Sequence, residues 1–299
     1  MPSRSSTPPP RNAGAWGITA PPRSSMPPCR RKRSTPTGSR PNCRRSSRSA
    51  PPPISPSRSI RHRRRSRTGT TMAGTLTSVV AERTKTAHEQ AENKPFITGL
   101  LNGSANVRCY VSLITALLPV YEELEAQVRS RNDDASIALF DHRRLDRGSR
   151  IREDLRGFGQ DPDRLVVNPA TRRYVDAIRE TATSPQRLLA HHYTRYLGDL
   201  AGGQAIARNV MTHYDIAPRL LSFYDFSDLG DVVHYRRRYK SLLDLVPWSE
   251  AEREDFIDEA QLAFALNAAL FDELADQDAC TERPAASGFL VAELAHGPR

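Results

Sequence analysis

Apolar residues recur at helical spacing from residue 74 to residue 277, and this pattern limits the possible folds more than any other feature of the sequence. Apolar residues at i, i+3 and i+4 predict amphipathic α-helices, whereas strands would show strict alternation between hairpin turns. No such alternation is present. We therefore predict an all-α fold. The expected helices span residues 74–94, 106–130, 142–158, 170–182, 185–214, 231–245 and 249–277.

Prolines mark the boundaries of many of these segments, because a proline cannot donate a backbone hydrogen bond inside a helix. Pro95, Pro169 and Pro185 lie at such boundaries. Pro119 is different, since it falls inside the segment 106–130 and is expected to kink that helix. The connections between the helices are expected to be short.

The first 71 residues differ in composition from the rest of the chain. They hold 17 of the 44 lysines and arginines, 14 of the 23 prolines and no acidic residue, whereas residues 72–299 carry a net charge of −7. Such a segment cannot bury enough apolar surface to offset its chain entropy. We predict a disordered extension over residues 1–71, one domain over 72–280 and a C-terminal tail over 281–299.

Three interpretations of the extension stay open. An arginine- and serine-rich N-terminus without acidic residues suits an organellar transit peptide. The run RHRRRSR suits nucleic acid or a nuclear import receptor, but no folded basic face with aromatic residues accompanies it, so nucleic acid is not an expected partner. The third is a misassigned gene start, because Met72 is followed at once by a plausible N-terminal sequence.

The sequence favours a protein without a membrane partner. No stretch approaches the roughly 20 apolar residues of a membrane span. No apolar signal-peptide core precedes Met72. We expect a cytoplasmic protein, and a plastid location would follow only if residues 1–71 were a transit peptide.

The stretch YLGDLAGGQAIAR, residues 196–208, places glycines inside a predicted helix, where each costs about 1 kcal/mol relative to alanine. Gly198 and Gly202 are spaced i, i+4 and should share one face of the helix, where they would open a trough. A close helix–helix crossing would explain the glycines alone. It would not explain why the carboxylate of Asp199 lies beside the trough, with Arg195 one turn earlier. A flat ligand next to ordered water would explain both.

A second segment, residues 79–94, carries His88 at the border of its apolar face, among small residues. Glu92 follows four residues on, where a carboxylate can orient an imidazole that binds a metal. Alone, this pattern is most often a surface histidine paired with a carboxylate. Together with the glycine trough it indicates a haem held between two helices, with His88 on the iron and an open position opposite.

Both motifs resemble the haem oxygenase family, and most closely its bacterial type. The similarity is carried by TAHEQAEN and HHYTRYLGDLAGGQ and extends over residues 75–277. It implies a single-domain, haem-oxygenase-like helical bundle, with haem sandwiched between a proximal helix and a kinked distal helix over residues 185–214. It also implies the reaction, which is the oxidative opening of haem to biliverdin, CO and ferrous iron.

The resemblance assigns a role to each motif residue. His88 would be the proximal ligand of the haem iron, and Glu92 would orient it. The implied distal residues are Gly198, Gly202, Asp199, Arg195 and Tyr121. The glycines would let the backbone lie over the haem, the carboxylate would hold the waters that deliver protons, and the arginine and tyrosine would complete that network. An ordinary core position is the alternative for the tyrosine.

The haem propionates need cations at the pocket mouth. The resemblance places a basic pair at Arg236 and Lys240, with Tyr193 as a further contact. A lysine that the family often carries seven residues before the proximal histidine is missing here, and Arg83 or Lys85 would substitute for it. Residues that match a family stretch packing near the haem are Phe264, Asn267 and Phe271. By default these three are core residues.

Haem would serve as both substrate and cofactor in this reaction. The reaction also consumes O2 and electrons, and the sequence shows no flavin, dinucleotide or iron–sulfur motif. The electrons are therefore expected from an external reductase or ferredoxin. A monomer is expected, and iron acquisition is the expected purpose of a bacterial-type enzyme.

Two other classes of protein stay open. A non-catalytic haem carrier or sensor would keep His88 and the fold, but would have little use for the glycines with their neighbouring carboxylate. A thiaminase-like hydrolase of the same fold class would need a nucleophilic cysteine, for which Cys109 is the candidate. His191 and His192 are expected in core or surface roles rather than as ligands.

Overall fold

The structure is a computed structural model that describes residues 74–276 except residue 141. The predicted extension 1–71 and the predicted tail 281–299 lie outside these residues. Within the described part of the chain all regular structure is helical and no strand is formed, which confirms the all-α prediction. Over the same residues, no helix is both long and apolar enough to cross a membrane.

The helices follow the predicted segments closely. The α-helices are α1 (Leu76–Glu92), α2 (Pro95–Asn102), α3 (Val107–Arg129), α4 (His142–Leu145), α5 (Gly148–Gly157), α6 (Pro169–Glu180), α7 (Pro185–Gly198), α8 (Gln204–Tyr214), α9 (Val232–Asp244) and α10 (Glu250–Ala275). A five-residue π-helical turn, η2 (Asp199–Gly203), joins α7 to α8. Short 3₁₀ turns are η1 (Ile137–Leu139), η3 (Pro218–Leu220), η4 (Ser222–Tyr224) and η5 (Ser227–Leu229).

Local sequence signals explain where several helices begin. Pro95, Pro169 and Pro185 each open a helix, at a position where the missing N–H would have had no partner within the helix. α10 begins with a capping box, in which Ser249 and Glu252 each accept from the other's backbone N–H. These signals are local, and their positions were therefore readable from the sequence.

Two differences from the predicted helices have clear causes. The sequence predicts one helix over 142–158, but the structure has α4 and α5, because the chain turns at Arg147 and directs that side chain inward. The helix α2 was not predicted, since its eight residues are too few for a helical period to stand out. Pro119 lies inside α3, as predicted.

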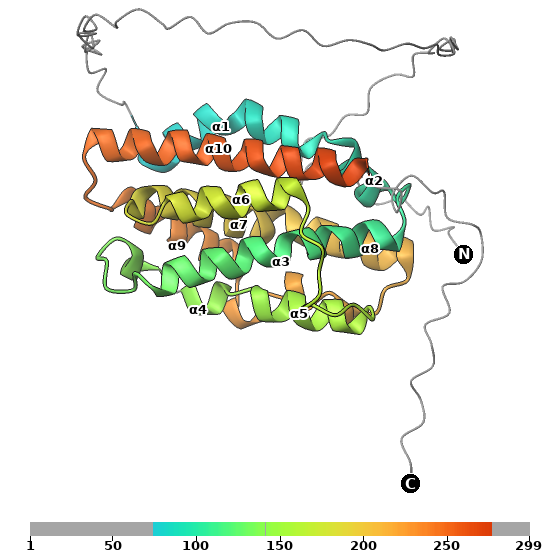
Figure 1. Ribbon diagram of the computed structural model, residues 1–299. Helices are drawn as coiled ribbons and strands as arrows, with labels where there is room; N and C mark the ends of the chain where they lie inside the picture. Colours follow the sequence, from blue (N-terminus) through green and yellow to red (C-terminus); the bar gives the residue numbers. More distant parts are fainter. Residues whose placement is uncertain (1–73, 141, 277–299) are drawn as a thin grey trace, which may run out of the picture. The chain divides into compact units, whose positions relative to one another are not determined.

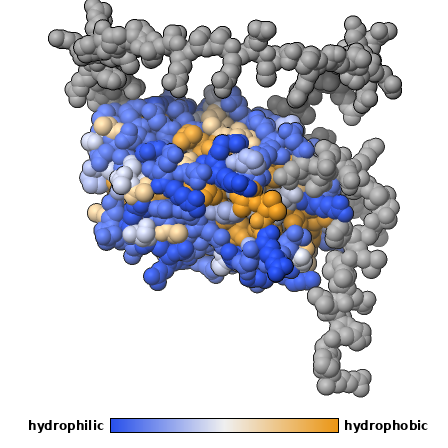
Figure 2. Space-filling view, in the orientation of Figure 1, coloured by the Kyte–Doolittle hydropathy of each residue, from blue (hydrophilic) through white to orange (hydrophobic). Residues whose placement is uncertain are grey.

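The described helices pack in layers that enclose one core. α1 and α10 run side by side, and α10 also packs on α7 and α6. α3 lies between α6 and α5, next to the other edge of the bundle in Figure 1. The face shown in Figure 2 is mostly hydrophilic, with an apolar area near the middle of the view. The two helices that carry the sequence motifs, α1 and α7, are thus both held by α10.

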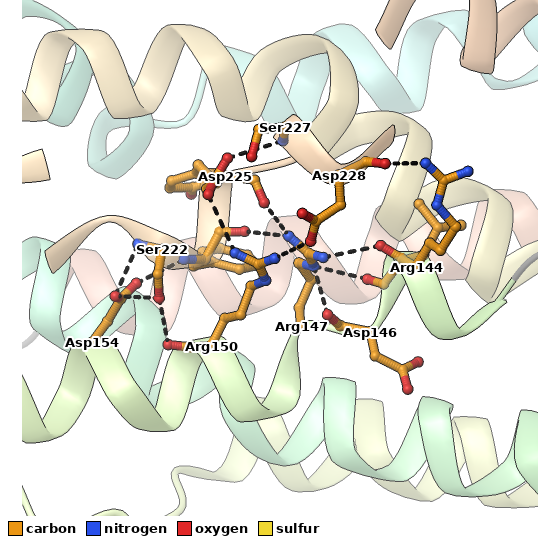
Figure 3. A network of polar contacts seen from close by, with 12 residues as sticks. Arg144, Asp146, Arg147, Arg150, Asp154, Ser222, Asp225, Ser227 and Asp228 are labelled. Carbon is orange, nitrogen blue, oxygen red and sulfur yellow. Dashed lines mark hydrogen bonds and ion pairs between the residues drawn. The ribbon is translucent and has the colours of Figure 1, made fainter. Parts of the chain in front are cut away.

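A buried arginine ties α5 to the segment that follows α8 (Figure 3). Arg147 is 2% exposed, donates from Nη1 to the carbonyl of Asp225 at 2.7 Å, and lies 4.1 Å from the ring centroid of Phe226. Its Nε donates to the carbonyls of the turn that precedes α5. Asp154 completes the tie by accepting the backbone N–H of Ser222 at 2.9 Å.

Replacing Arg147 with Met should destabilise the fold by about 3 kcal/mol, because several buried backbone carbonyls lose their donor. Urea denaturation of the ligand-free protein measures this loss. The matched control is Arg143→Met, an exposed arginine on α4, which should change the free energy of unfolding by no more than about 0.5 kcal/mol. Equal effects of the two substitutions would show that Arg147 does not stabilise the fold in this way.

Candidate functional site

A cavity of about 310 Å³ lies among α1, α7, η2, α9 and α10. Its volume is in the range of pockets that bind small organic molecules. Most of the predicted site residues line it. Those residues are Lys85, His88, Glu92, Tyr193, Arg195, Gly198, Asp199, Arg236, Lys240, Phe264, Asn267 and Phe271. The fold thus brings four separate sequence segments to one place.

His88 forms one wall of the cavity. Its Nε2 lies 3.0 Å from Oε1 of Glu92, and its ring meets that of Phe264 edge to face, with centroids 5.3 Å apart. Burial lowers the pKa of His88, although Glu89 partly opposes this, and burial raises the pKa of Glu92 to about 7. Because the lowered pKa keeps the imidazole neutral at neutral pH, His88 is in the form that binds a metal.

A buried polar network forms the wall contributed by α7 and η2. The Tyr121 hydroxyl donates to Oδ2 of Asp199. Arg195 donates to the Tyr121 hydroxyl from Nη2 at 2.9 Å and to Oδ1 of Asn267 from Nη1 at 2.6 Å. Its Nη2 also lies 3.4 Å from Oδ1 of Asp199. Tyr121 does not itself line the cavity, and it reaches the site only through these two partners.

Burial shifts the acid–base properties of this network. It raises the pKa of Asp199, while the Arg195 guanidinium and the Tyr121 hydroxyl act to lower it. Burial also raises the pKa of Tyr121 well above its usual range. The tyrosine therefore stays protonated and acts as a donor, and Asp199 is the carboxyl group of this network that lines the cavity.

The glycines of this wall differ in what lies beside them. A Cβ on Gly198 would meet nothing within 4 Å, so this residue leaves open space, and it lines the cavity. A Cβ on Gly203 would lie 2.7 Å from the ring of Tyr224, which occupies the place of the missing side chain. Gly203 also lines the cavity, whereas Gly202 is buried without lining it.

The prediction of one regular helix over this stretch is corrected, because Asp199–Gly203 form a π-helical turn. The role predicted for Gly202 stays a prediction. The turn between α7 and α8 is π-helical, and such a turn contains about one residue more than an α-helical turn. This extra residue brings position i+5, which is Gly203, to the face where the α-helical spacing predicted position i+4.

Two cations on α9 form one side of the cavity, and a third cation lines it from α1. Arg236 and Lys240 line it from α9, and Lys85 lines it from α1. The Nε of Arg236 is buried without a hydrogen-bond partner, so it offers an unused donor. Burial and the neighbouring Arg236 lower the pKa of Lys240, and burial raises the pKa of Tyr193 to about 12. A ligand with anionic groups at this side would fit these residues.

The structure also distinguishes the two substitutes for the missing family lysine. Arg83 is held by Glu254 at 2.6 Å and Asp258 at 3.0 Å, and it does not line the cavity. Lys85 does line the cavity, with Glu89 at a longer distance of 3.9 Å. Lys85 is therefore the substitute that the geometry permits.

Some residues near the site were missed or left unassigned by the sequence analysis. Tyr224 lines the cavity from η4, a 3₁₀ turn with no helical period that could have marked it. His191 and His192 are fully buried and do not line the cavity, in agreement with the predicted core role. Cys109 is fully buried on α3 and does not line the cavity either.

Alanine at the two cavity glycines should give opposite changes in stability. We expect Gly198→Ala to leave the ligand-free protein unchanged or to stabilise it by up to about 1 kcal/mol, since alanine favours a helix and the space is open. We expect Gly203→Ala to destabilise it by about 1–3 kcal/mol, because Tyr224 must move. Urea denaturation of both variants tests this, and a loss at Gly198 as large as that at Gly203 would contradict it.

Comparison with known proteins agrees with the resemblance in the sequence. A family model described as "Heme oxygenase" matches residues 75–273. The heme oxygenase of Pyropia yezoensis is 35% identical over 209 residues, which cover 68% of this chain and 87% of that protein. Heme oxygenase 1 of the cyanobacterium Synechocystis is 34% identical over 209 residues, with 68% and 86% covered.

A solved structure shows the same fold. The crystal structure of the Synechocystis heme oxygenase-1 in complex with heme superimposes with a TM-score of 0.64 at 32% identity, and it covers 67% of this chain and 92% of that chain. The human heme oxygenase 1 is 31% identical over 206 residues, with 67% and 71% covered. On the matched family model and these relatives, the chain belongs to the haem oxygenase family.

Proposed function

We propose that the cavity is where this haem oxygenase binds haem and opens it to biliverdin, CO and ferrous iron. The observation that supports this most strongly is that His88 and the Arg195–Asp199 network line the same cavity. Gly198 lines it too, and it leaves open the space that a Cβ would occupy. The reaction requires two groups from the protein. One is a neutral imidazole, and the other is a buried carboxylate that exchanges a proton.

On the proximal wall, His88 would hold the haem iron. Glu92 lies within 3.0 Å of its ring and would fix the ring orientation through the nitrogen that does not bind the metal. Phe264 packs edge to face on the imidazole and limits its rotation. When bound, haem supplies both the iron that activates O2 and the ring that is cleaved.

On the distal wall, Gly198 would let the helix backbone approach the ligand closely, because no side chain fills that space. Asp199 would hold and move a proton at its carboxyl group on the cavity side. Tyr121 and Arg195 keep that carboxyl in place by donating to its two oxygens. Because the acid is buried and anchored, it would act through water rather than by touching the reacting atoms.

The cations fit the anionic side of haem. Arg236 and Lys240 would bind the propionates from α9, and Lys85 would help from α1. The buried, unpartnered Nε of Arg236 supports this, since a propionate oxygen would supply the acceptor that it lacks. Tyr193, beside Arg236 in the same cavity wall, would contact the same end of the ligand.

The electrons would come from an external reductase or ferredoxin, as the sequence predicts. The exposed arginines Arg237 and Arg238 lie on α9, the helix that also carries Arg236 and Lys240. They would favour an acidic donor protein there. The cytoplasmic location, the monomeric state and a role in iron acquisition stay predictions from the sequence.

A turnover assay distinguishes a haem oxygenase from a non-catalytic haem carrier or sensor. The full chain is loaded with one equivalent of haem, reductant is added in air with catalase present, and the absorption spectrum is followed. We expect loss of the Soret band and growth of a biliverdin band. A haem spectrum that persists through repeated reduction would contradict the enzyme and leave the carrier.

Asp199→Asn should slow this ring opening by about 100-fold or more, because an amide cannot exchange a proton as a carboxyl does. Its haem affinity should change little, since Asp199 does not bind the ligand directly. The matched control is Asp176→Asn, an exposed aspartate on α6, which should turn over at the wild-type rate. An equal rate for both variants would remove Asp199 from the mechanism.

Arg236→Met should weaken haem binding about tenfold, or about 1.4 kcal/mol, because a propionate loses its charged donor. Titration of the protein with haem measures the dissociation constant. Arg237→Met is the matched control, since Arg237 is exposed on the same helix and does not line the cavity. If both variants bind haem like the wild type, Arg236 does not hold a propionate.

A further inference from the structure

A second cavity lies on a different face of α9 from the first cavity. Its volume is about 260 Å³, smaller than that of the first cavity, so it suits a small ligand. The α9 residues that line it are spaced i, i+3, i+4 and i+7, which places them on one face of the helix. They are Tyr235, Arg238, Tyr239 and Leu242. The proposed reaction makes no use of this second cavity.

Two aromatic rings form the floor of the second cavity. Phe140 and Tyr239 are 6% and 2% exposed, and their ring centroids lie 4.5 Å apart. The Tyr239 hydroxyl is hydrogen-bonded to Nδ1 of His192 at 2.8 Å, so Tyr239 offers its ring to the cavity rather than its hydroxyl. Because both rings are buried and packed on each other, they form a fixed apolar surface on which a flat group can lie.

Two guanidinium groups line the second cavity from different helices, Arg238 from α9 and Arg144 from α4. Arg238 makes no hydrogen bond or ion pair with any residue that the structure describes. Arg144 donates from Nη2 to the backbone carbonyl of Asp228, which orients its guanidinium (Figure 3). The Asp228 carboxylate is paired with Nη2 of Arg150 at 2.5 Å. None of the described lining residues is acidic, so the charge of the cavity wall favours an anion.

We propose that the second cavity is a ligand site of its own, for a small aromatic carboxylate. The carboxylate would lie against Arg238 and Arg144, because a guanidinium presents paired N–H donors to the two oxygens of a carboxylate. The ring would lie on Phe140 and Tyr239. The two arginines alone would accept any anion, and the two rings alone would accept any flat apolar molecule. Together they select a molecule that has both parts.

The second cavity is accessible without any change in the fold. Leu139 in its wall is 41% exposed, and Arg238 is exposed as well. Arg236 and Lys240, the α9 cations proposed for the propionates, line the first cavity and not the second. A ligand in the second cavity would therefore contact α9 without entering the first cavity. This inference does not depend on the proposed function.

The first test uses the full chain without haem and benzoate as the probe, with binding measured by ligand-detected saturation-transfer NMR. We expect a dissociation constant of about 1 mM or below, which is realistic for so small a ligand. Benzamide has the shape of benzoate without its charge, and acetate has the charge without the ring. Each should bind at least about tenfold more weakly than benzoate. If either of them binds as well as benzoate, the proposal is overturned.

The second test places the probe in the cavity. Arg238→Gln should weaken benzoate binding about tenfold, because the carboxylate loses a charged donor. The matched control is Arg237→Gln, since Arg237 is exposed on the same helix and lines neither cavity. Arg236→Met, which removes a cation of the first cavity, should leave the benzoate dissociation constant unchanged. Binding that is lost in Arg236→Met and kept in Arg238→Gln would assign benzoate to the first cavity and overturn the proposal.

The third test fills the cavity and leaves both arginines in place. Ala138 is exposed and lines the second cavity, so Ala138→Phe should fold like the wild type and lose benzoate binding. Asp141→Asn, at a position outside the described residues, should bind benzoate like the wild type. Binding that appears only in Asp141→Asn would mean that a carboxylate of the chain itself satisfies the arginines, and it would overturn the proposal. A protein that binds benzoate but opens no haem contradicts only the proposed function.

Discussion

The distal wall depends on the burial of a charged pair. Arg195 and Asp199 are 6% and 5% exposed, and charges at that depth are strongly unfavourable unless they are paired and hydrogen-bonded. Tyr121 from α3 and Asn267 from α10 supply the remaining partners. Removing one partner would leave a buried charge without compensation. The buried pair therefore requires four elements to pack together beside the cavity, namely α3, α7, η2 and α10.

A second constraint acts on the same wall from a distance. Tyr224 lies beside Gly203 of the π-turn η2, and its aromatic ring fills the space where a Cβ would be. Tyr224 lies in a segment of short 3₁₀ turns, which has little regular backbone bonding of its own. The tie made by Arg147 and Asp154 holds that segment against α5 (Figure 3). The shape of the cavity thus depends in part on an arginine that does not line it.

The two walls differ in how they meet solvent. The His88 side chain is 45% exposed, whereas the Arg195 and Asp199 side chains are 6% and 7% exposed. A ligand that is also a substrate has to enter and its product has to leave, and an accessible proximal wall permits that exchange. The buried distal wall keeps its dipoles in a fixed orientation, which is what electrostatic control of a proton requires. The arrangement joins an accessible wall to a rigid one.

The sequence by itself determined the helical class, most helix boundaries and the two motif helices, because helical periodicity, proline positions and caps are local signals. It also indicated His88, Glu92 and Asp199. The first two are spaced i, i+4 on one helix face, and the third lies beside the glycines of the distal helix. Only the tertiary structure decided that Gly203 lines the cavity beside Tyr224, because Tyr224 comes from a distant segment and η2 is π-helical rather than α-helical. The same holds for Tyr121 and Asn267. Both meet Arg195 from other helices, and no local pattern records which buried atoms meet.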